Sequence, residues 1–191
     1  VHGGVGAAGE ARTTRADERA VRHGDPATGH PVRAGSLLAA IVVSTNSNLV
    51  VVWQDGRFSG VRDGIAVSRS NDGGFTWSVP TRINGNTAVQ AFEPSVKVRT
   101  DGTIGVTYYD FSHNTTSAAT LLTDYWLARS SDGINFQENL VSGPFNLNIA
   151  PLTPTDAGGY FLGGYQALLL NPNLLLPVYD ARTKRSPTTT S

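Results

Sequence analysis

The stretch Ser68–Trp77, which reads SRSNDGGFTW, combines a turn with a large aromatic residue that a surface turn does not need. Its two glycines allow backbone conformations with positive φ, and the Asp72 carboxylate can accept hydrogen bonds from N–H groups of its own turn. Thr76 is typical of a chain that returns to a strand, and we expect Trp77 to pack between two sheets. The stretch therefore predicts a tight corner between two strands, anchored in a hydrophobic core.

This corner has a degenerate copy further along the chain. Residues 130–136 read SSDGINF, one residue shorter, with Asp132 placed 60 positions after Asp72 and with Phe136 in place of the tryptophan. Three strand ends also resemble one another, namely VVVWQDGR with Asp55, GVTYYDFS with Asp110 and LLPVYDAR with Asp180. Elements that recur at such an interval indicate a repeat architecture.

Short apolar runs separated by turn residues predict strands throughout the region that carries the repeats. We expect about ten strands, paired as hairpins over residues 36–55, 64–83, 94–110, 124–141 and 165–180. The run Leu49–Trp53 is apolar at consecutive positions, which is typical of a strand buried on both faces. No long helix is expected, so the fold class is all-β and antiparallel.

The architecture that fits these repeats is a β-propeller of four-stranded antiparallel blades. Each repeat contains two strands, of which the second ends in an aspartate, and then two strands joined by a glycine corner. Such a unit fits the roughly 40–50 residues of a propeller blade. The chain then supplies about two and a half to three blades, whereas propellers close with about 4–8. We expect either a fragment of a longer protein or a homo-dimer that completes a six-bladed ring.

The two ends of the chain differ from this central region. Residues 1–35 contain no aromatic residue, so we expect a poorly ordered or loosely docked segment there, a partial propeller over 36–183 and a flexible tail over 184–191. We expect no signal peptide within residues 1–35. His23, Asp25 and His30 match no familiar metal-site spacing, and we expect neither a metal nor a cofactor.

The composition excludes several classes of function. The 191 residues include 15 basic and 15 acidic side chains, and this zero net charge argues against nucleic acid or a membrane surface as a partner. The absence of cysteine rules out disulfides, thiolate metal sites and a cysteine nucleophile. A nucleophile-elbow sequence for Ser/His/Asp hydrolysis is also missing.

Residues 70–77 match the pattern Ser-x-Asp-x-Gly-x-Thr-Trp and resemble the Asp box, or BNR repeat, of sialidase-type propellers. The segments WQDGRFSG, TYYDFSHN, LLTDYWLARSSDG and YFLGGYQAL are similar to bacterial exo-α-sialidase-like proteins, over roughly three quarters of the chain. The resemblance implies a secreted or extracellular bacterial protein with a carbohydrate ligand. It also implies a structural role for the box residues Ser70, Asp72, Gly74, Thr76, Trp77, Ser130, Asp132, Gly133 and Phe136.

A sialidase needs arginines that bind the substrate carboxylate, a tyrosine nucleophile activated by a glutamate, and an aspartic acid as proton donor. The candidates for the catalytic roles are Asp55, Asp110, Tyr109 and Glu93. The candidates for substrate binding are Arg57, Arg62, His113, Tyr125, Asp180 and Arg182. Each has a structural alternative, because strand-end aspartates can cap the following loop, the tyrosines can be core residues, and Glu93 can be a solvated residue at a strand entry.

The resemblance leaves three functions open. The first is a sialidase-like, carbohydrate-active propeller that hydrolyses terminal sialic acid or a related glycoside; if it is an enzyme, it is a glycoside hydrolase of exo-α-sialidase type. The second is a non-catalytic propeller that binds glycans or proteins and uses Asp boxes as scaffold. The third is a hydrolase of another substrate class on the same scaffold, because a fold does not determine a function.

Overall fold

The computed structural model describes residues 40–43, 48–60, 62–150, 167–171 and 174–178. These residues contain ten β-strands and two short 3₁₀ helices, and no α-helix is found among them. Every strand pair in the described residues is antiparallel. The prediction of an all-β, antiparallel fold is confirmed.

The described strands form two four-stranded sheets and one hairpin. Sheet 1 has the order β1 (Ala40–Val43), β2 (Leu49–Asp55), β3 (Gly64–Ser70) and β4 (Thr81–Arg82). Sheet 2 has the order β5 (Ala91–Val98), β6 (Ile104–Asp110), β7 (Leu122–Ser130) and β8 (Gln137–Asn146). The hairpin pairs β9 (Ala167–Asn171) with β10 (Leu174–Val178), and the 3₁₀ helices are η1 (Gly56–Phe58) and η2 (Leu147–Ile149).

Sheets 1 and 2 repeat the same path through space. In both, the second strand ends in an aspartate, Asp55 or Asp110, and the third strand leads into a glycine corner at Ser70 or Ser130. Because neighbouring strands run in opposite directions, the aspartates and the corners lie at opposite ends of each sheet. We call these the loop end and the corner end.

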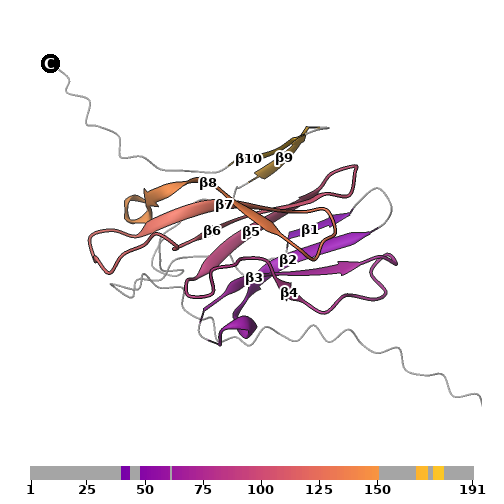
Figure 1. The fold of residues 1–191 in the computed structure, drawn as a ribbon, viewed down its shortest axis with the longest axis horizontal. Coiled ribbons are helices and arrows are strands. Elements are labelled where there is room, and N and C mark those ends of the chain that lie inside the picture. The colour runs from indigo at the N-terminus through magenta and orange to yellow at the C-terminus, as the bar shows by residue number, and fades with distance from the viewer. Residues whose placement is uncertain (1–39, 44–47, 61, 151–166, 172–173, 179–191) are drawn as a thin grey trace, which may run out of the picture.

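Sheet 2 lies between sheet 1 and the β9–β10 hairpin, as Figure 1 shows. One buried cluster fills the space between the two sheets and includes Val50, Val52, Ile65, Val67, Val96, Ile104, Val106 and Tyr108. On the opposite face of sheet 2, an aromatic cluster contains Phe92, Tyr109, Phe111 and Tyr125, and Leu127 packs against Leu175 of β10. Strand β6 is consequently buried at every position.

Strand β2 differs from β6 in this respect. Val50 and Val52 are buried, whereas Leu49, Val51 and Trp53 are half-buried. The prediction that Leu49–Trp53 is buried on both faces is therefore wrong. The reason is that the described residues place sheet 2 against only one face of sheet 1.

Glu138 of β8 links sheet 2 to the connection that leaves sheet 1. Its Oε2 accepts a hydrogen bond from the N–H of Gly85 at 2.9 Å, and its Oε1 accepts one from the hydroxyl of Tyr108. Burial and the neighbouring Glu138 carboxylate raise the pKa of Tyr108 far above its ordinary value. Tyr108 is thus a neutral hydrogen-bond donor to Glu138, and it belongs to the buried cluster between the two sheets.

Replacing Glu138 should weaken this link. We expect Glu138→Ala to lower the free energy of unfolding by roughly 1–3 kcal/mol, because the Tyr108 hydroxyl and the Gly85 N–H lose their acceptor. Glu138→Gln, which keeps one side-chain oxygen, should lose less. Urea unfolding followed by tryptophan fluorescence measures the difference, with Gln137→Ala on the exposed side of β8 as the control; equal stabilities for Glu138→Ala and this control would contradict the assignment.

Candidate functional site

Asp55 ends β2 and caps the helix η1 that follows. Its Oδ1 accepts the backbone N–H of Arg57 at 2.9 Å, and its Oδ2 accepts the indole N–H of Trp53 at 2.8 Å. The Arg57 Nε lies 2.9 and 2.8 Å from the two carboxylate oxygens. Burial alone would raise the pKa of Asp55, but the hydrogen bonds from Arg57 and Trp53 outweigh it and lower that pKa. Asp55 is therefore an ionised carboxylate that orients Arg57.

Asp110 repeats this cap at the end of β6. Its Oδ1 accepts the backbone N–H of Ser112 at 3.0 Å and the indole N–H of Trp126 at 2.8 Å, and its Oδ2 accepts the Ser112 hydroxyl at 2.7 Å. Here burial outweighs the hydrogen bonds and, together with the neighbouring Asp124, raises the pKa of Asp110. Asp110 is thus the more readily protonated of the two strand-end carboxyl groups.

Asp124, at the start of β7, is a buried acid that the sequence did not indicate as a site residue. It lies directly opposite Asp110 in the β6–β7 register and is fully buried. Its Oδ2 accepts the backbone N–H of His113 at 3.0 Å and lies 2.9 Å from the His113 Nδ1. The counterpart of Asp124 in the first repeat is Gly64, which lies opposite Asp55. Comparing the two repeats therefore shows an acid in place of a glycine, and this difference is the signal in the sequence that identifies Asp124.

Tyr109 and Tyr125 lie in the aromatic cluster of sheet 2. Their ring centroids are 4.6 Å apart, and Phe92 stacks on Tyr109 at 5.7 Å. Tyr109 is 1% exposed and Tyr125 is fully buried. This burial favours the core alternative for both tyrosines and argues against Tyr109 as a nucleophile and Tyr125 as a ligand contact.

Glu93 adopts a left-handed backbone conformation with φ of 49°. It falls at the irregularity between Phe92 and Ser95 in the pairing of β5 with β6, and its N–H donates to Oε1 of Gln54 in sheet 1 at 3.2 Å. A non-glycine residue rarely adopts this conformation, so the junction between the sheets imposes it. A second glutamate, Glu138, accepts a hydrogen bond from the hydroxyl of Tyr108.

The loop end exposes basic groups above these buried acids. The Arg57 side chain is 60% exposed while its guanidinium binds Asp55, and the His113 side chain is 52% exposed beside Asp124. Arg62 is also exposed, and Ser59 holds its backbone through hydrogen bonds to both its carbonyl and its N–H. An oriented guanidinium of this kind can bind a carboxylate through charge-assisted hydrogen bonds. Asp180 and Arg182 lie outside the described residues.

The corner that follows β3 is closed by the Asp72 carboxylate. Its Oδ1 accepts the N–H of Thr76 at 2.9 Å and the hydroxyl of Ser70 at 2.7 Å, and its Oδ2 accepts the Thr76 hydroxyl at 2.5 Å. The Ser70 hydroxyl in turn accepts the N–H of Gly74 at 2.8 Å. Gly74 has φ of 98°, which explains the glycine at this position.

The shorter corner after β7 has the same internal bonding. Asp132 Oδ1 accepts the N–H groups of Ile134 and Asn135 and the hydroxyl of Ser130, each at 2.8 Å. The Ser130 hydroxyl accepts the N–H of Gly133 at 2.8 Å. These hydrogen bonds lower the pKa of Asp132 well below its ordinary value, so the carboxylate is ionised at neutral pH.

The aromatic residues of the two corners behave differently. Phe136 packs against the cluster between the sheets, whereas Trp77 is 41% exposed and its indole N–H donates to the Gly74 carbonyl at 3.0 Å. The expectation that Trp77 packs between two sheets is therefore wrong for the described residues. The corner of sheet 2 has sheet 1 beside it, and the corner of sheet 1 has no described sheet on the corresponding side.

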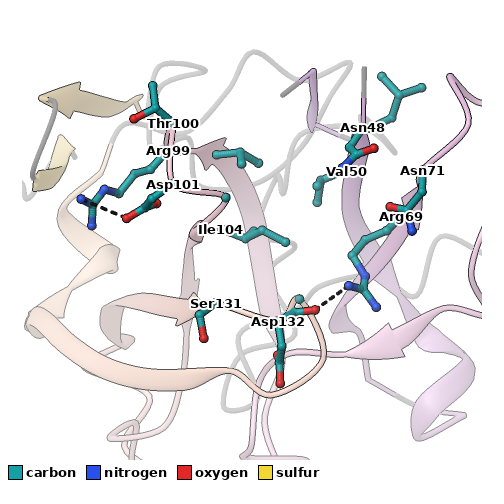
Figure 2. A pocket seen from close by; sticks show the side chains of 14 residues that line it. Asn48, Val50, Arg69, Asn71, Arg99, Thr100, Asp101, Ile104, Ser131 and Asp132 are labelled. Carbon is teal, nitrogen blue, oxygen red and sulfur yellow. Dashed lines mark hydrogen bonds and ion pairs between the residues drawn. The ribbon is translucent and has the colours of Figure 1, made fainter. Parts of the chain in front are cut away.

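A pocket of about 260 Å³ lies at the corner end, between β2, the β5–β6 hairpin and the second corner (Figure 2). Figure 2 shows Arg69 reaching from one wall to the Asp132 carbonyl, a hydrogen bond of 2.6 Å. On the other side Arg99 pairs with Asp101 at 3.2 Å. The Arg69 contact joins sheet 1 to a corner of sheet 2, whereas the Arg99–Asp101 pair lies within the β5–β6 hairpin, and the pocket is remote from the aspartates of the loop end.

Two further findings concern the described residues only. There, no group of three or more His, Cys, Asp or Glu side chains is arranged to hold a metal ion, and no helix is long and apolar enough to cross a membrane. His23, Asp25 and His30 lie outside the residues that the structure describes.

The fold and the loop end together define an all-β protein of stacked antiparallel sheets whose aspartate-capped loops gather at one end. No family model and no curated protein matches the chain. Among solved structures it is similar to the Hadza microbial sialidase Hz136, with 20% identity and a TM-score of 0.45 over 54% of this chain and 25% of that one. It is also similar to an α-L-arabinofuranosidase from Fusarium graminearum in complex with an iminosugar inhibitor, with 13% identity and a TM-score of 0.42 over 54% and 30%. The chain thus matches less than a third of the length of either protein.

The hydrogen bonds of the first corner predict a pH-dependent contribution to stability. They lower the pKa of Asp72 from 3.8 to about 2, with the Thr76 hydroxyl as the largest cause. The contribution is therefore fully present above about pH 4 and is lost as the pH falls through about 2. We expect Asp72→Asn to be less stable than the unmodified protein at neutral pH, with a difference that shrinks between these values. Urea midpoints from pH 2 to 7 measure it, with Asn71→Ala as the exposed control; a difference that does not change with pH would contradict this origin.

Proposed function

We propose that this chain is part of a carbohydrate-directed β-propeller. In this proposal sheets 1 and 2 are consecutive blades, the β9–β10 hairpin begins a third, and the Asp-box corners are scaffold. Support comes from the shared strand order, the shared corner bonding and the stacking of sheet 2 between sheet 1 and the hairpin. The ligand then lies at the loop end, where successive blades each contribute an aspartate-capped loop.

The ligand that fits this end is an acidic sugar, such as a terminal sialic acid. The observation that carries the proposal is the geometry of Arg57, whose guanidinium is oriented by both oxygens of Asp55 while 60% of the side chain stays exposed. Arg62 and His113 add exposed basic groups on the loops of the same end. Because Asp55 neutralises Arg57 only through one edge of the guanidinium, the remaining N–H groups are available to a sugar carboxylate.

Binding without hydrolysis is the activity that the described residues support best. Tyr109 is buried in the aromatic cluster, and the lowered pKa of Asp55 makes this residue a poor proton donor.

Hydrolysis of a sialoside or related glycoside is a second candidate function. The observation that favours it is the pair Asp110 and Asp124, two adjacent buried acids of which one has a raised pKa, because such pairs divide acid and base roles in glycosidases.

Binding of an acidic sugar tests the proposal directly. We expect sialyllactose to bind and lactose to bind at least about tenfold more weakly, because only the former carries a carboxylate for Arg57. Arg57→Ala should remove this preference, and Arg129→Ala, an exposed arginine near the corner end, should not. Saturation-transfer NMR and titration calorimetry measure both ligands. Equal affinities for the two sugars, or an unchanged preference in Arg57→Ala, would contradict the proposal.

A fluorogenic sialoside separates binding from hydrolysis. We expect no turnover from this chain while sialyllactose binds. If turnover is found, and Asp110→Asn or Asp124→Asn reduces it at least about a hundredfold, the second candidate function replaces the first. Circular dichroism of both variants shows whether they remain folded.

A further inference from the structure

The loop end of sheet 2 contains a buried acid that the first repeat lacks. Asp110 already accepts the N–H of Ser112, so the cap at the end of β6 does not need a second carboxyl group. In the first repeat, Gly64 stands in the place of Asp124. Two adjacent buried acids also repel each other when both are ionised, which costs free energy. Asp124 therefore has a role other than the capping of this strand.

The hydrogen bonds of Asp124 show what this role is. Its Oδ1 has no hydrogen-bond partner among the described residues, and Gly143 of β8 leaves the space for it, because a Cβ atom there would lie 2.5 Å from Oδ1. Its Oδ2 accepts two hydrogen bonds, both from His113. Within the described part of the chain, the polar contacts of the Asp124 side chain thus serve His113.

These two contacts fix the imidazole ring of His113. The backbone N–H lies 3.0 Å from Asp124 Oδ2, and Nδ1 lies 2.9 Å from the same oxygen. The second contact is a hydrogen bond because Nδ1 carries a proton, so Nε2 is the ring nitrogen that is left for a ligand. The His113 side chain is 52% exposed although Asp124 is fully buried. The buried acid therefore orients a ring that a ligand can reach.

The backbone on either side of His113 is also held in place. Three successive N–H groups have acceptors at 3.0 Å: Ser112 donates to Asp110, His113 to Asp124, and Asn114 to the Phe111 carbonyl. The Asn86 side chain, on the connection between the two sheets, donates to the Ser112 hydroxyl at 3.1 Å and holds this loop beside that connection. A ligand that contacts His113 does not have to order this part of the loop, which lowers the entropy cost of binding.

The other polar groups of the loop end leave one kind of contact unfilled. Arg57 offers N–H donors only. The carboxyl groups of Asp55, Asp110 and Asp124 belong to residues that are 7%, 2% and 0% exposed, so burial withholds their oxygens from a ligand. A sugar hydroxyl both donates and accepts, and it can bind Nε2 of His113 whether or not that nitrogen carries a proton.

We propose that Nε2 of His113 binds a hydroxyl group of the acidic sugar, and that Asp124 is the residue that positions the ring. The inference rests on the proposed function and extends it. Arg57 binds the carboxylate of the ligand, and His113 determines which pattern of hydroxyl groups is accepted. The ligand is then a polyhydroxylated acid, and a simple carboxylate makes only half of the contacts.

Analogues of sialyllactose that each lack one hydroxyl of the sialic acid residue test the contact. For one of them, we expect binding to the unmodified protein to weaken about fivefold, and binding to His113→Ala to be as tight as that of complete sialyllactose. For the other analogues, any loss should be the same in both proteins, because only the contacted hydroxyl is coupled to His113. Titration calorimetry measures the affinities. Thr115→Ala, an exposed position of the same loop, is the matched control and should keep the pattern of the unmodified protein.

The outcome separates this inference from the function on which it rests. If sialyllactose binds with the preference that Arg57 provides, but every analogue loses the same factor in His113→Ala and in the unmodified protein, the inference is wrong and the proposed function stands. If sialyllactose does not bind the unmodified protein, both are wrong.

The tautomer of His113 tests the role of Asp124 without a ligand. Proton–nitrogen correlation NMR of the unmodified protein should show the proton of the neutral ring on Nδ1. Asp124→Leu removes the acceptor, so the proton should move to Nε2 in a large share of the molecules, and the affinity for sialyllactose should fall by about the same factor as in His113→Ala. Circular dichroism shows whether this variant folds. A neutral ring with its proton on Nε2 in the unmodified protein would overturn the proposal, whatever the state of the variant.

Discussion

The burial of strand β6, in the middle of sheet 2, on both of its faces is the constraint on which the rest of the described structure depends. Strand β6 has no exposed residue, so it requires apolar partners on two sides, which are sheet 1 on one side and the aromatic cluster around Tyr109 on the other. In this stack the inner strand β6 meets solvent only beyond its two ends, whereas the edge strand β8 stays partly exposed along its length. The polar groups that bear on function are therefore confined to the loop end and the corner end.

The buried carboxylates at the loop end have a structural role that does not depend on a ligand. Where a strand stops, the backbone N–H groups of the next residues lose their ladder partners, and an aspartate at the boundary accepts them. Asp55 and Asp110 both do this with the residue two positions later, yet their surroundings separate their chemistry. Asp55 faces a guanidinium and has a lowered pKa, whereas Asp110 faces a hydroxyl and a second acid and has a raised pKa.

Features that depend on neighbours in sequence could be predicted from the sequence, and features that depend on neighbouring strands or sheets could not. The two corners follow from contacts within four residues, such as Asp72 with Thr76, and their glycines identify the turns. Asp124 and Glu138 acquire their partners across a strand register and across a sheet junction, and no local pattern marks either. The exposure of Trp77 depends on whether a further sheet is present, which residues 68–77 alone do not reveal.

The arginines of the two ends show why the loop end is the better place for a ligand. At the corner end, Arg69 spans from one sheet to the other to reach the Asp132 carbonyl, so its displacement by a ligand would break a contact between the sheets. At the loop end, Arg57 takes its partner from two residues earlier, on its own strand end. A local pair of this kind orients the guanidinium without joining two sheets, so a ligand can share it with no loss of packing. The cap at the end of β2 therefore also holds the Arg57 guanidinium in a fixed orientation at the surface. The proposed recognition of an acidic sugar requires only that the guanidinium keep this orientation.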